Sequence, residues 1–469
     1  MDAVEALMRF RIPEADVALR TLSREPGAAP AAHHLLSMSA FLTGLVTDQE
    51  SDFERFAAHA DTLEELLKSA EPSCWTAYMR AETELQRGVA AVKAEQYLKA
   101  AWHGRAAYKR YVRAIRDYPD FVELYKGIGL MHLGIGSLPG GWRRFLGILG
   151  YRGSVQQGIE ELERAARGSV INRDAATLSI GLAKSMLGLD APGGVARLAE
   201  VHRRRPESPF FGYLYAYALI DNRLAAEAEE ILSQYAEQRD DGVHQYIDYV
   251  DYYLARAHFV QDEFDEAAEH YRVYLANHHG PSLRAAALVG LGMSLEMLGR
   301  VDEARAQYQA VRATREYDID EVARREAARR LREPLTGRRR ALLLGANAYD
   351  SGRYERATTI LTQVFNDPDA EGEERVEAAY RMGRVHHALG NGDAALEAYG
   401  YAVENARDPE AKWAPWARLY SGEIYAARGD DREAEEAFRD AMAYRGPFDY
   451  QQTLEQSARA AIEKLKASR

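Results

Sequence analysis

The sequence predicts an all-α protein, more specifically a right-handed α-solenoid of helical hairpins with one glycine-rich insertion. Three observations lead to this prediction. A frame of small residues, a glycine and an aromatic residue recurs five times, only 15 of the 469 residues are proline, and apolar residues recur at three-to-four-residue spacing along most of the chain. Stacked helical repeats satisfy all three observations.

The helical pattern begins near the N-terminus. Five segments carry apolar residues at helical spacing there, namely 2–23, 30–46, 50–69, 72–117 and 119–135. Pro72 and Pro119 lie at the expected helix starts, where the missing amide hydrogen of proline is tolerated. We therefore expect N-terminal helical hairpins over residues 1–135.

A glycine-rich and apolar segment follows at 136–158. Ten glycines fall between Gly127 and Gly158, and Pro139 lies among them. So many glycines disfavour a continuous helix, but the segment is too apolar for a free linker. We expect a buried loop with a short helix. An alternative is that its Trp142–Leu149 stretch touches a membrane as an apolar wedge.

The repeat array is predicted for 159–445 and is clearest from 209 onwards. Each copy has a small residue on its first helix, an alanine twelve positions later, and an aromatic residue or leucine four positions further. In four copies a glycine stands seven positions after the small residue, at the turn. The small residues are Ala216, Ala255, Gly292, Gly345, Gly383 and Gly422. These are helical hairpins of the tetratricopeptide type.

The spacing of the copies predicts two further features. Successive small residues are 39, 37, 53, 38 and 39 positions apart, which is longer than the roughly 34 residues of a standard tetratricopeptide repeat. Each unit therefore holds about one extra helical turn, and the 53-residue interval predicts an additional helix at roughly 320–332. The final segment, 446–469, predicts a capping helix.

Part of the chain resembles a known family. The run AAWHGRAAYKRY at 100–111, and the segment YKGIGLMHLGIGSLPGGWRRFLGILGYRGSVQQGIEELERAA at 125–166, are similar to the inclusion-body clearance / tetratricopeptide repeat protein 39 family. The resemblance covers about residues 1–300. It implies a non-enzymatic, all-helical repeat protein that acts through protein contacts, with better-known relatives associated with lipid droplets and protein inclusions. It carries no catalytic residues.

Composition and motifs argue against several functional classes. The 60 Lys and Arg residues against 72 Asp and Glu give a net charge of −12, which disfavours broad nucleic-acid binding. The single cysteine, Cys74, excludes an internal disulfide framework and a cysteine-based zinc site. The sequence contains no phosphate-binding loop, nucleophile elbow or zinc-protease motif. We expect no enzymatic activity, no cofactor and no metal.

Histidines and arginines gather in places. Adjacent histidines on a helix point about 100° apart and do not readily chelate one ion, so we expect structural roles for the pairs His33-His34, His278-His279 and His386-His387. Eight arginines against Glu326 and Glu333 give 324–340 a local charge of +6. This run could receive an acidic peptide, a phosphate or a membrane surface. The alternative is a solvated helix with cations near its C-terminal end.

A concave groove is the best candidate site in the sequence. The first helix of each hairpin lines the concave surface of such arrays, and the repeat frame predicts which side chains it presents. Aromatic residues with scattered arginines suit peptide binding, because they give a large contact area at low entropic cost. The predicted residues are Tyr213, Tyr217, Tyr249, Tyr252, Arg256, Met293, Glu296, Tyr349, Tyr380, Arg384, His387, Trp416 and Glu423. The alternative is that the tyrosines pack between neighbouring repeats.

The sequence therefore predicts a protein-interaction scaffold that binds a protein or peptide segment along the concave surface of 209–430. One alternative is a carrier of lipid or a small apolar ligand near residues 127–150, and another is a hydrolase or metal enzyme. No run of 18 apolar residues predicts a membrane span, although peripheral membrane or lipid contact stays open. The helical pattern starts at Asp2 without a secretory leader, which fits a cytoplasmic protein or an exported one whose signal has been removed.

Overall fold

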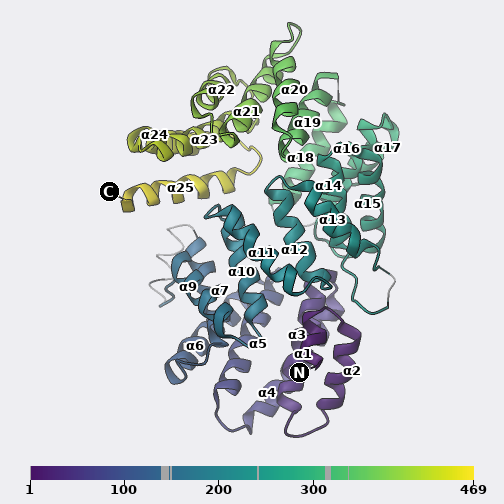
Figure 1. The fold of residues 1–469 in the computed structure, drawn as a ribbon, viewed down its shortest axis with the longest axis vertical. Helices are drawn as coiled ribbons and strands as arrows, with labels where there is room; N and C mark the ends of the chain where they lie inside the picture. Colours follow the sequence, from purple (N-terminus) through teal and green to yellow (C-terminus); the bar gives the residue numbers. More distant parts are fainter. Residues whose placement is uncertain are drawn as a thin grey trace. The chain divides into compact units, whose positions relative to one another are not determined.

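The computed structural model describes residues 2–138, 147, 150–239, 242–311, 318–335 and 337–468. These residues form twenty-four α-helices, most of them paired with a neighbour in the sequence as hairpins (Figure 1). The predicted all-helical solenoid of hairpins is confirmed. Within the described ranges, no helix is long and apolar enough to cross a membrane.

Contacts between helices divide the chain into two compact units. The N-terminal unit consists of Met1–Asn222, Glu227–Tyr253 and Ala276–Gly280, and the C-terminal unit of Arg223–Ala226, Leu254–Leu275 and Pro281–Arg469. Each unit has its own buried core, and each is described separately below.

The N-terminal unit is built from four closely packed helix pairs, α3 with α4, α5 with α6, α7 with α9, and α10 with α11, flanked by α1, α2 and α12. The bounds of these helices are α1 (Asp2–Met8), α2 (Ile12–Leu22), α3 (Ala29–Thr47), α4 (Glu50–Lys68), α5 (Cys74–Lys93), α6 (Tyr97–Asp117), α7 (Leu124–Ser137), α9 (Val155–Gly168), α10 (Arg173–Met186), α11 (Ala191–Arg204) and α12 (Pro209–Asp221).

Three helices cross the border between the units, and the rest belong to the C-terminal unit. The border helices are α13 (Ala225–Ala236), α14 (Tyr249–Val260) and α15 (Phe264–Asn277). The others are α16 (Arg284–Met297), α17 (Val301–Ala310), α18 (Asp318–Arg332), α19 (Gly337–Asp350), α20 (Tyr354–Asn366), α21 (Gly372–Ala388), α22 (Gly392–Asn405), α23 (Trp413–Arg428), α24 (Asp431–Ala443) and α25 (Gln451–Ser468).

Two helical segments predicted near the N-terminus are each divided by a turn. Segment 2–23 forms α1 and α2, and segment 72–117 forms α5 and α6. The chain reverses at Phe10 and Glu95, which adopt left-handed backbone angles with φ of 61° and 59°. The sequence conceals both turns because neither residue is the glycine that usually occupies this conformation.

The repeat frame works as predicted where two helices of a hairpin cross. A Cβ atom added to Gly383 on α21 would lie 2.4 Å from the ring of Tyr399 on α22. The same addition to Gly422 on α23 would lie 2.6 Å from the ring of Phe438 on α24. The glycine therefore makes room for the aromatic residue sixteen positions later. Four of the repeat turns end at a glycine with positive φ, as the frame predicts: Gly299, Gly352, Gly390 and Gly429.

Replacing Gly383 by alanine is expected to lower the free energy of unfolding by about 1–3 kcal/mol, because the new methyl group overlaps the fully buried Tyr399 ring. Gly400 on α22 has no neighbour within 4 Å of an added Cβ. Gly400→Ala should therefore leave the free energy unchanged or raise it by up to about 1 kcal/mol, since alanine is the better helix former. Urea unfolding of both variants tests the difference, and equal losses would contradict this explanation of the frame.

Two predicted helices outside the frame are also present. Helix α18 fills the 53-residue interval between copies, close to the predicted 320–332. Helix α25 packs Leu454, Ala458 and Ile462 against Leu419 and Phe438 of the last hairpin, and so covers the end of the array. The predicted apolar wedge, Trp142–Leu149, lies outside the described residues except for Gly147.

The core of the N-terminal unit contains buried charges. Glu82 on α5 and Lys126 on α7 form an ion pair, and their side chains are only 4% and 10% exposed. The hydroxyl of Tyr111 donates to Glu82 at 2.5 Å. His34 on α3 is also buried, and within the described residues neither nitrogen of its ring has a hydrogen-bond partner. Apolar residues such as Leu124, Ile128 and Leu162 surround this network.

Candidate functional site

The predicted groove residues of the N-terminal unit form an aromatic cluster. Tyr213, Tyr249 and Tyr252 are buried and Tyr217 is half-buried. The ring of Tyr253, which was not predicted, lies 6.2 Å from that of Tyr213, 5.3 Å from that of Tyr217 and 5.1 Å from that of Tyr252. These tyrosines pack against one another between α12 and α14. This arrangement resembles the alternative given above, in which the tyrosines pack between neighbouring repeats and do not line an open groove.

In the C-terminal unit, one predicted arginine, Arg384, lies among side chains from the first helices of successive hairpins, of which Tyr349, Tyr380 and His387 were predicted and Tyr420 was not. The guanidinium of Arg384 on α21 donates to the hydroxyl of Tyr420 at 2.8 Å, of Tyr349 at 3.0 Å and of Tyr380 at 3.3 Å. It also lies over the ring of Tyr420, 4.0 Å from its centroid. The ring of His387 is 6.2 Å from that of Tyr420. Helices α19, α21 and α23 thus contribute to one cluster.

A second guanidinium reaches the same phenol. Arg223 Nη2 donates to the Tyr349 hydroxyl at 2.6 Å, and its guanidinium lies 4.5 Å from the centre of that ring. Arg223 stands seven positions after Ala216, where four other copies of the repeat have glycine, and its φ is 67°. This left-handed conformation costs an arginine about 1–2 kcal/mol. Such strain is often found at functional sites.

We call Arg223, Tyr349, Tyr380, Arg384 and Tyr420 the Tyr–Arg face. Within the part of the chain that the structure describes, neither arginine has a carboxylate at ion-pairing distance, and their hydrogen bonds go to phenol oxygens. Burial disfavours the charge of Arg384, but the surrounding tyrosines favour it more strongly and hold its pKa well above the usual value. The face therefore keeps two cations without an acidic partner.

Two carboxylates border the face. Asp350 and Glu423 are open to solvent, yet the protein around them limits their hydration. This desolvation raises the pKa of Glu423 to about 7, against the opposing effect of Arg384. It also raises the pKa of Asp350 in spite of Arg381, Arg384 and Arg223. With a pKa of about 7, Glu423 is only partly ionised at neutral pH, which weakens it as a counter-ion for the arginines.

A buried phenol lies behind the face. Tyr399 on α22 is fully buried, and its ring is 6.1 Å from that of Tyr420 and 6.4 Å from that of Tyr380. Its hydroxyl has no hydrogen-bond partner among the described residues. Burying a hydroxyl without a hydrogen-bond partner costs stability. The Tyr399 hydroxyl is therefore a polar group whose hydrogen-bonding capacity is not used by the described residues.

The other predicted residues lie apart from the five that define the face. The indole of Trp416 donates to the backbone carbonyl of Asp449 at 3.3 Å, which ties it to the segment before α25. Glu296 is buried and accepts a hydrogen bond from Tyr308 at 2.8 Å, a structural role. Arg256 and Met293 are half-buried on α14 and α16. His387 is half-buried, and burial lowers its pKa.

Sequence reasoning missed Arg223, Tyr420 and Trp413. Tyr420 lies two positions before Gly422, and Trp413 begins the same helix, with its ring 5.2 Å from that of Tyr380. Arg223 had a signal, because a long basic side chain stands at a turn position where four of the other copies have glycine. Its partner Tyr349 is 126 residues further along the chain, which no local pattern could indicate.

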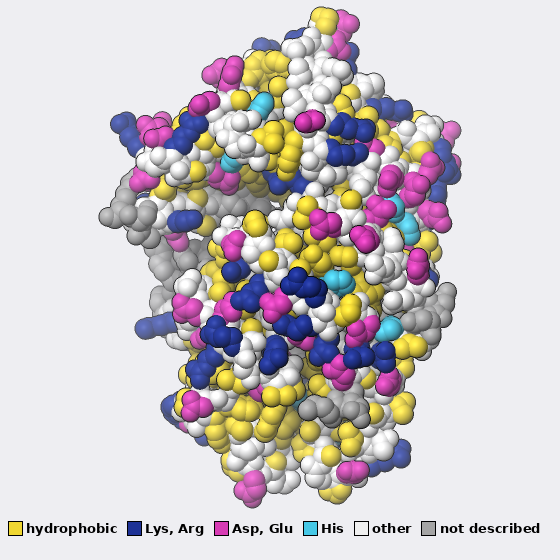
Figure 2. Space-filling view, in the orientation of Figure 1, with side chains coloured by type: hydrophobic (Ala, Val, Ile, Leu, Met, Phe, Trp, Pro, Cys, Tyr) yellow, Lys and Arg dark blue, Asp and Glu magenta, His cyan; other side chains and the backbone are white. Residues whose placement is uncertain are grey.

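The arginine run 324–340 is largely paired within its own surroundings. Arg324 and Arg325 pair with Glu321, and Arg329 and Arg330 pair with Glu326. Arg338 and Arg339 pair with Glu374 and Glu333. The predicted local charge of +6 omitted Glu321 and Glu374, which lie outside the run. Figure 2 likewise shows acidic and basic side chains intermingled over much of the visible surface.

The adjacent histidines have separate surroundings. His34 is buried against the ring of Tyr78, and His33 Nδ1 lies 3.3 Å from His59 Nδ1. His278 is buried and lies 3.4 Å from a carboxylate oxygen of Asp48. His33 and His34 thus face different groups, and in the second pair His278 is buried while His279 is exposed.

Comparison with known families identifies tetratricopeptide repeats in the chain. A family model described as a tetratricopeptide repeat-like domain matches residues 300–459, and another described as a tetratricopeptide repeat matches residues 252–318. Such repeats generally act as protein–protein interaction modules and are generally non-enzymatic scaffolds. No curated protein matches the chain, and none of the matches supports the resemblance to the inclusion-body clearance family.

One solved structure of tetratricopeptide repeats aligns with much of the chain. The crystal structure of the P58(IPK) TPR domain aligns with 82% of this chain and 97% of its own length, at 14% sequence identity and a TM-score of 0.23.

Proposed function

We propose that this protein is a non-enzymatic interaction scaffold, and that the Tyr–Arg face binds an extended segment of a partner protein through an acidic group. One observation carries the proposal. Arg223 and Arg384, from two different hairpins, donate to the same Tyr349 oxygen at 2.6 and 3.0 Å while neither has a carboxylate partner among the described residues.

Charge and geometry both favour an acidic ligand. A guanidinium has five N–H donors and no acceptor, and the phenol oxygens use only part of this capacity. A partner's carboxylate at this position could accept from both arginines, which are the strongest donors for such a group. The negative charge of the carboxylate would then compensate the two neighbouring positive charges of Arg223 and Arg384.

The aromatic residues supply the rest of a binding surface. Trp413 and Tyr420 on α23 are half-buried, and both rings contact the buried ring of Tyr380 on α21. Tyrosine, tryptophan and arginine are the residues that most often dominate interface energetics. Their rigidity on helices means that little entropy is lost on binding.

The apolar-ligand alternative near 127–150 is less favoured. Gly129 on α7 and Gly158 on α9 let the two helices approach so closely that an added Cβ on Gly158 would lie 2.6 Å from the backbone nitrogen of Leu133. Gly129 and Gly158 therefore serve close helix packing.

Arg384→Gln is expected to weaken peptide binding about 10- to 150-fold, because one charge-assisted hydrogen bond contributes roughly 1.5–3 kcal/mol. Peptides would be selected from a displayed random library on the full chain, and their dissociation constants measured by fluorescence anisotropy. Arg223→Gln should weaken binding by a similar factor.

Arg432→Gln on α24 serves as the matched control, since Arg432 is exposed and removing it changes the net charge equally. Circular dichroism checks that each variant is folded. Peptides that bind Arg384→Gln, Arg223→Gln and the unchanged protein equally would contradict the proposal.

A further inference from the structure

Helix α6 of the N-terminal unit has an unusual outward face. Its buried residues are His103, Ala107, Tyr111 and Ala114, which lie on one side of the helix. The opposite side carries a stripe at three-to-four-residue spacing, formed by Leu98, Trp102, Arg105, Lys109, Val112 and Arg116. We call these six residues the α6 stripe.

The apolar end of the α6 stripe is strongly exposed. Leu98 is 91% exposed and Trp102 64% exposed, and Tyr97 beside them is 60% exposed. Gly88 packs against Ala100 and Gly104, which brings the α5 turn containing the exposed Val89 and Val92 to the same end. Single exposed apolar residues are common, but a contiguous set that includes tryptophan and tyrosine marks an interaction surface.

The charge of α6 is of one sign. It carries Lys99, Arg105, Lys109, Arg110, Arg113 and Arg116, and its first acidic residue is Asp117, the last of the helix. Arg110 pairs with Glu64 and Glu84, and Arg113 and Arg116 approach Asp117. Within the described ranges Lys99, Arg105 and Lys109 have no acidic partner. This is a concentrated basic surface on a protein of net charge −12.

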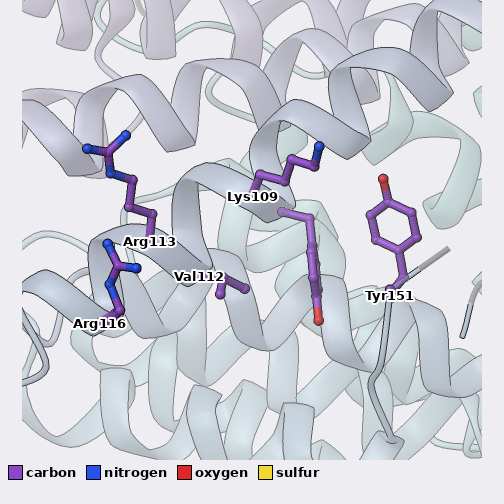
Figure 3. A pocket seen from close by; sticks show the side chains of 7 residues that line it. Lys109, Val112, Arg113, Arg116 and Tyr151 are labelled. Atoms are coloured by element: carbon purple, nitrogen blue, oxygen red, sulfur yellow. The ribbon is translucent and has the colours of Figure 1, made fainter.

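The basic end of the stripe borders a hollow of about 510 Å³. Lys109, Val112, Arg113 and Arg116 line it from α6, and Tyr151 lines it from the chain before α9 (Figure 3). The rings of Tyr108 and Tyr151 meet edge-to-face at 5.1 Å, and the Tyr108 hydroxyl donates to the Arg152 carbonyl at 3.0 Å. Three cations of α6 thus line one side of a space large enough for a phosphate-bearing headgroup.

We infer that the α6 stripe binds the surface of an anionic lipid bilayer. Exposed leucine, tryptophan and tyrosine are the residues that enter the interfacial region of a membrane. Lysine and arginine along the same face attract anionic headgroups. A nucleic acid would use the basic residues but would leave Leu98 exposed, and an acidic peptide has no need of the hollow. The inference is independent of the Tyr–Arg face, which lies in the other unit.

The test is cosedimentation of the full chain with vesicles of phosphatidylcholine alone or of phosphatidylcholine mixed with phosphatidylserine. We expect binding to the mixed vesicles only, with an affinity that falls as salt is raised. Arg105→Gln, Lys109→Gln and Arg116→Gln together should weaken binding about 100-fold, since each basic side chain near an anionic surface contributes roughly fivefold. Leu98→Ser with Trp102→Ser should weaken it at least about tenfold.

The charge-matched control replaces Arg20, Arg24 and Arg167, which are exposed elsewhere on the same unit, by glutamine. Trp102→Phe identifies the contact spectroscopically, because brominated lipids should quench the fluorescence of the unchanged protein more than that of this variant. Equal binding of the stripe variant and the control would overturn the inference. So would binding to polyglutamate, to RNA or to free phosphate without binding to the mixed vesicles.

Discussion

Replacing Lys126 by methionine is expected to lower the free energy of unfolding of the N-terminal unit by about 3–5 kcal/mol. Methionine keeps most of the side-chain volume but removes the positive charge from beside Glu82. Burial tends to raise the pKa of Glu82, and Lys126 and Tyr111 together hold it below the usual value. Without Lys126 the carboxylate must stay charged without a counter-ion or take up a proton, and both cost stability.

The loss can be measured by urea unfolding followed by circular dichroism. Hydrogen exchange in α5, α6 and α7 assigns it to this core. The double variant Lys126→Met with Glu82→Gln should recover most of the loss, because no uncompensated charge remains. Lys68→Met, at an exposed pair with Glu65, should change the free energy by less than about 0.5 kcal/mol. Equal losses in the single and double variants would contradict a coupled pair.

The stability of the N-terminal unit is expected to fall by about 3 kcal/mol as the pH is lowered from 6.5 to 4, through His34 alone. Burial lowers the pKa of His34 to about 4, with Glu82 opposing this effect and Lys126 adding to it. The unfolded chain takes up the proton near pH 6.5, where the folded chain does not. Stability is therefore complete above pH 6.5 and is lost progressively towards pH 4.

Unfolding free energies measured at several pH values test this dependence. His34→Leu removes the titrating group, and its stability curve should lack this part of the slope. His279→Gln changes an exposed neighbour of His278 in the sequence and should keep the slope. A His34→Leu curve parallel to that of the unchanged protein would show that other groups cause the acid sensitivity.

The hairpins were predictable because the contacts that define them are local. Gly383 and Tyr399 are sixteen residues apart, and the glycine, the turn and the aromatic residue all lie within one repeat. The divisions at Phe10 and Glu95 were not predictable in the same way. Both turns place an ordinary residue in the left-handed conformation, and the apolar spacing continues across them.

The candidate site was only partly predictable. The frame indicates which side of a first helix a residue such as Tyr349 or Tyr380 occupies, but it does not indicate how far the next helix covers that side. Both tyrosines are consequently buried to more than nine-tenths. The contact of Arg223 with Tyr349 depends on how a turn meets a helix more than one hundred residues away, which is a tertiary property.

The most direct test of the Tyr–Arg face is photo-crosslinking of a selected peptide to the full chain. A photoreactive amino acid would replace His387, which is half-buried beside Tyr420, and in a second variant the exposed Arg432 on α24. Binding along the face predicts a cross-link from position 387 that excess unlabelled peptide suppresses, and none from position 432. A cross-link from position 432, or none from position 387 while the peptide still binds with unchanged affinity, would contradict the proposed face.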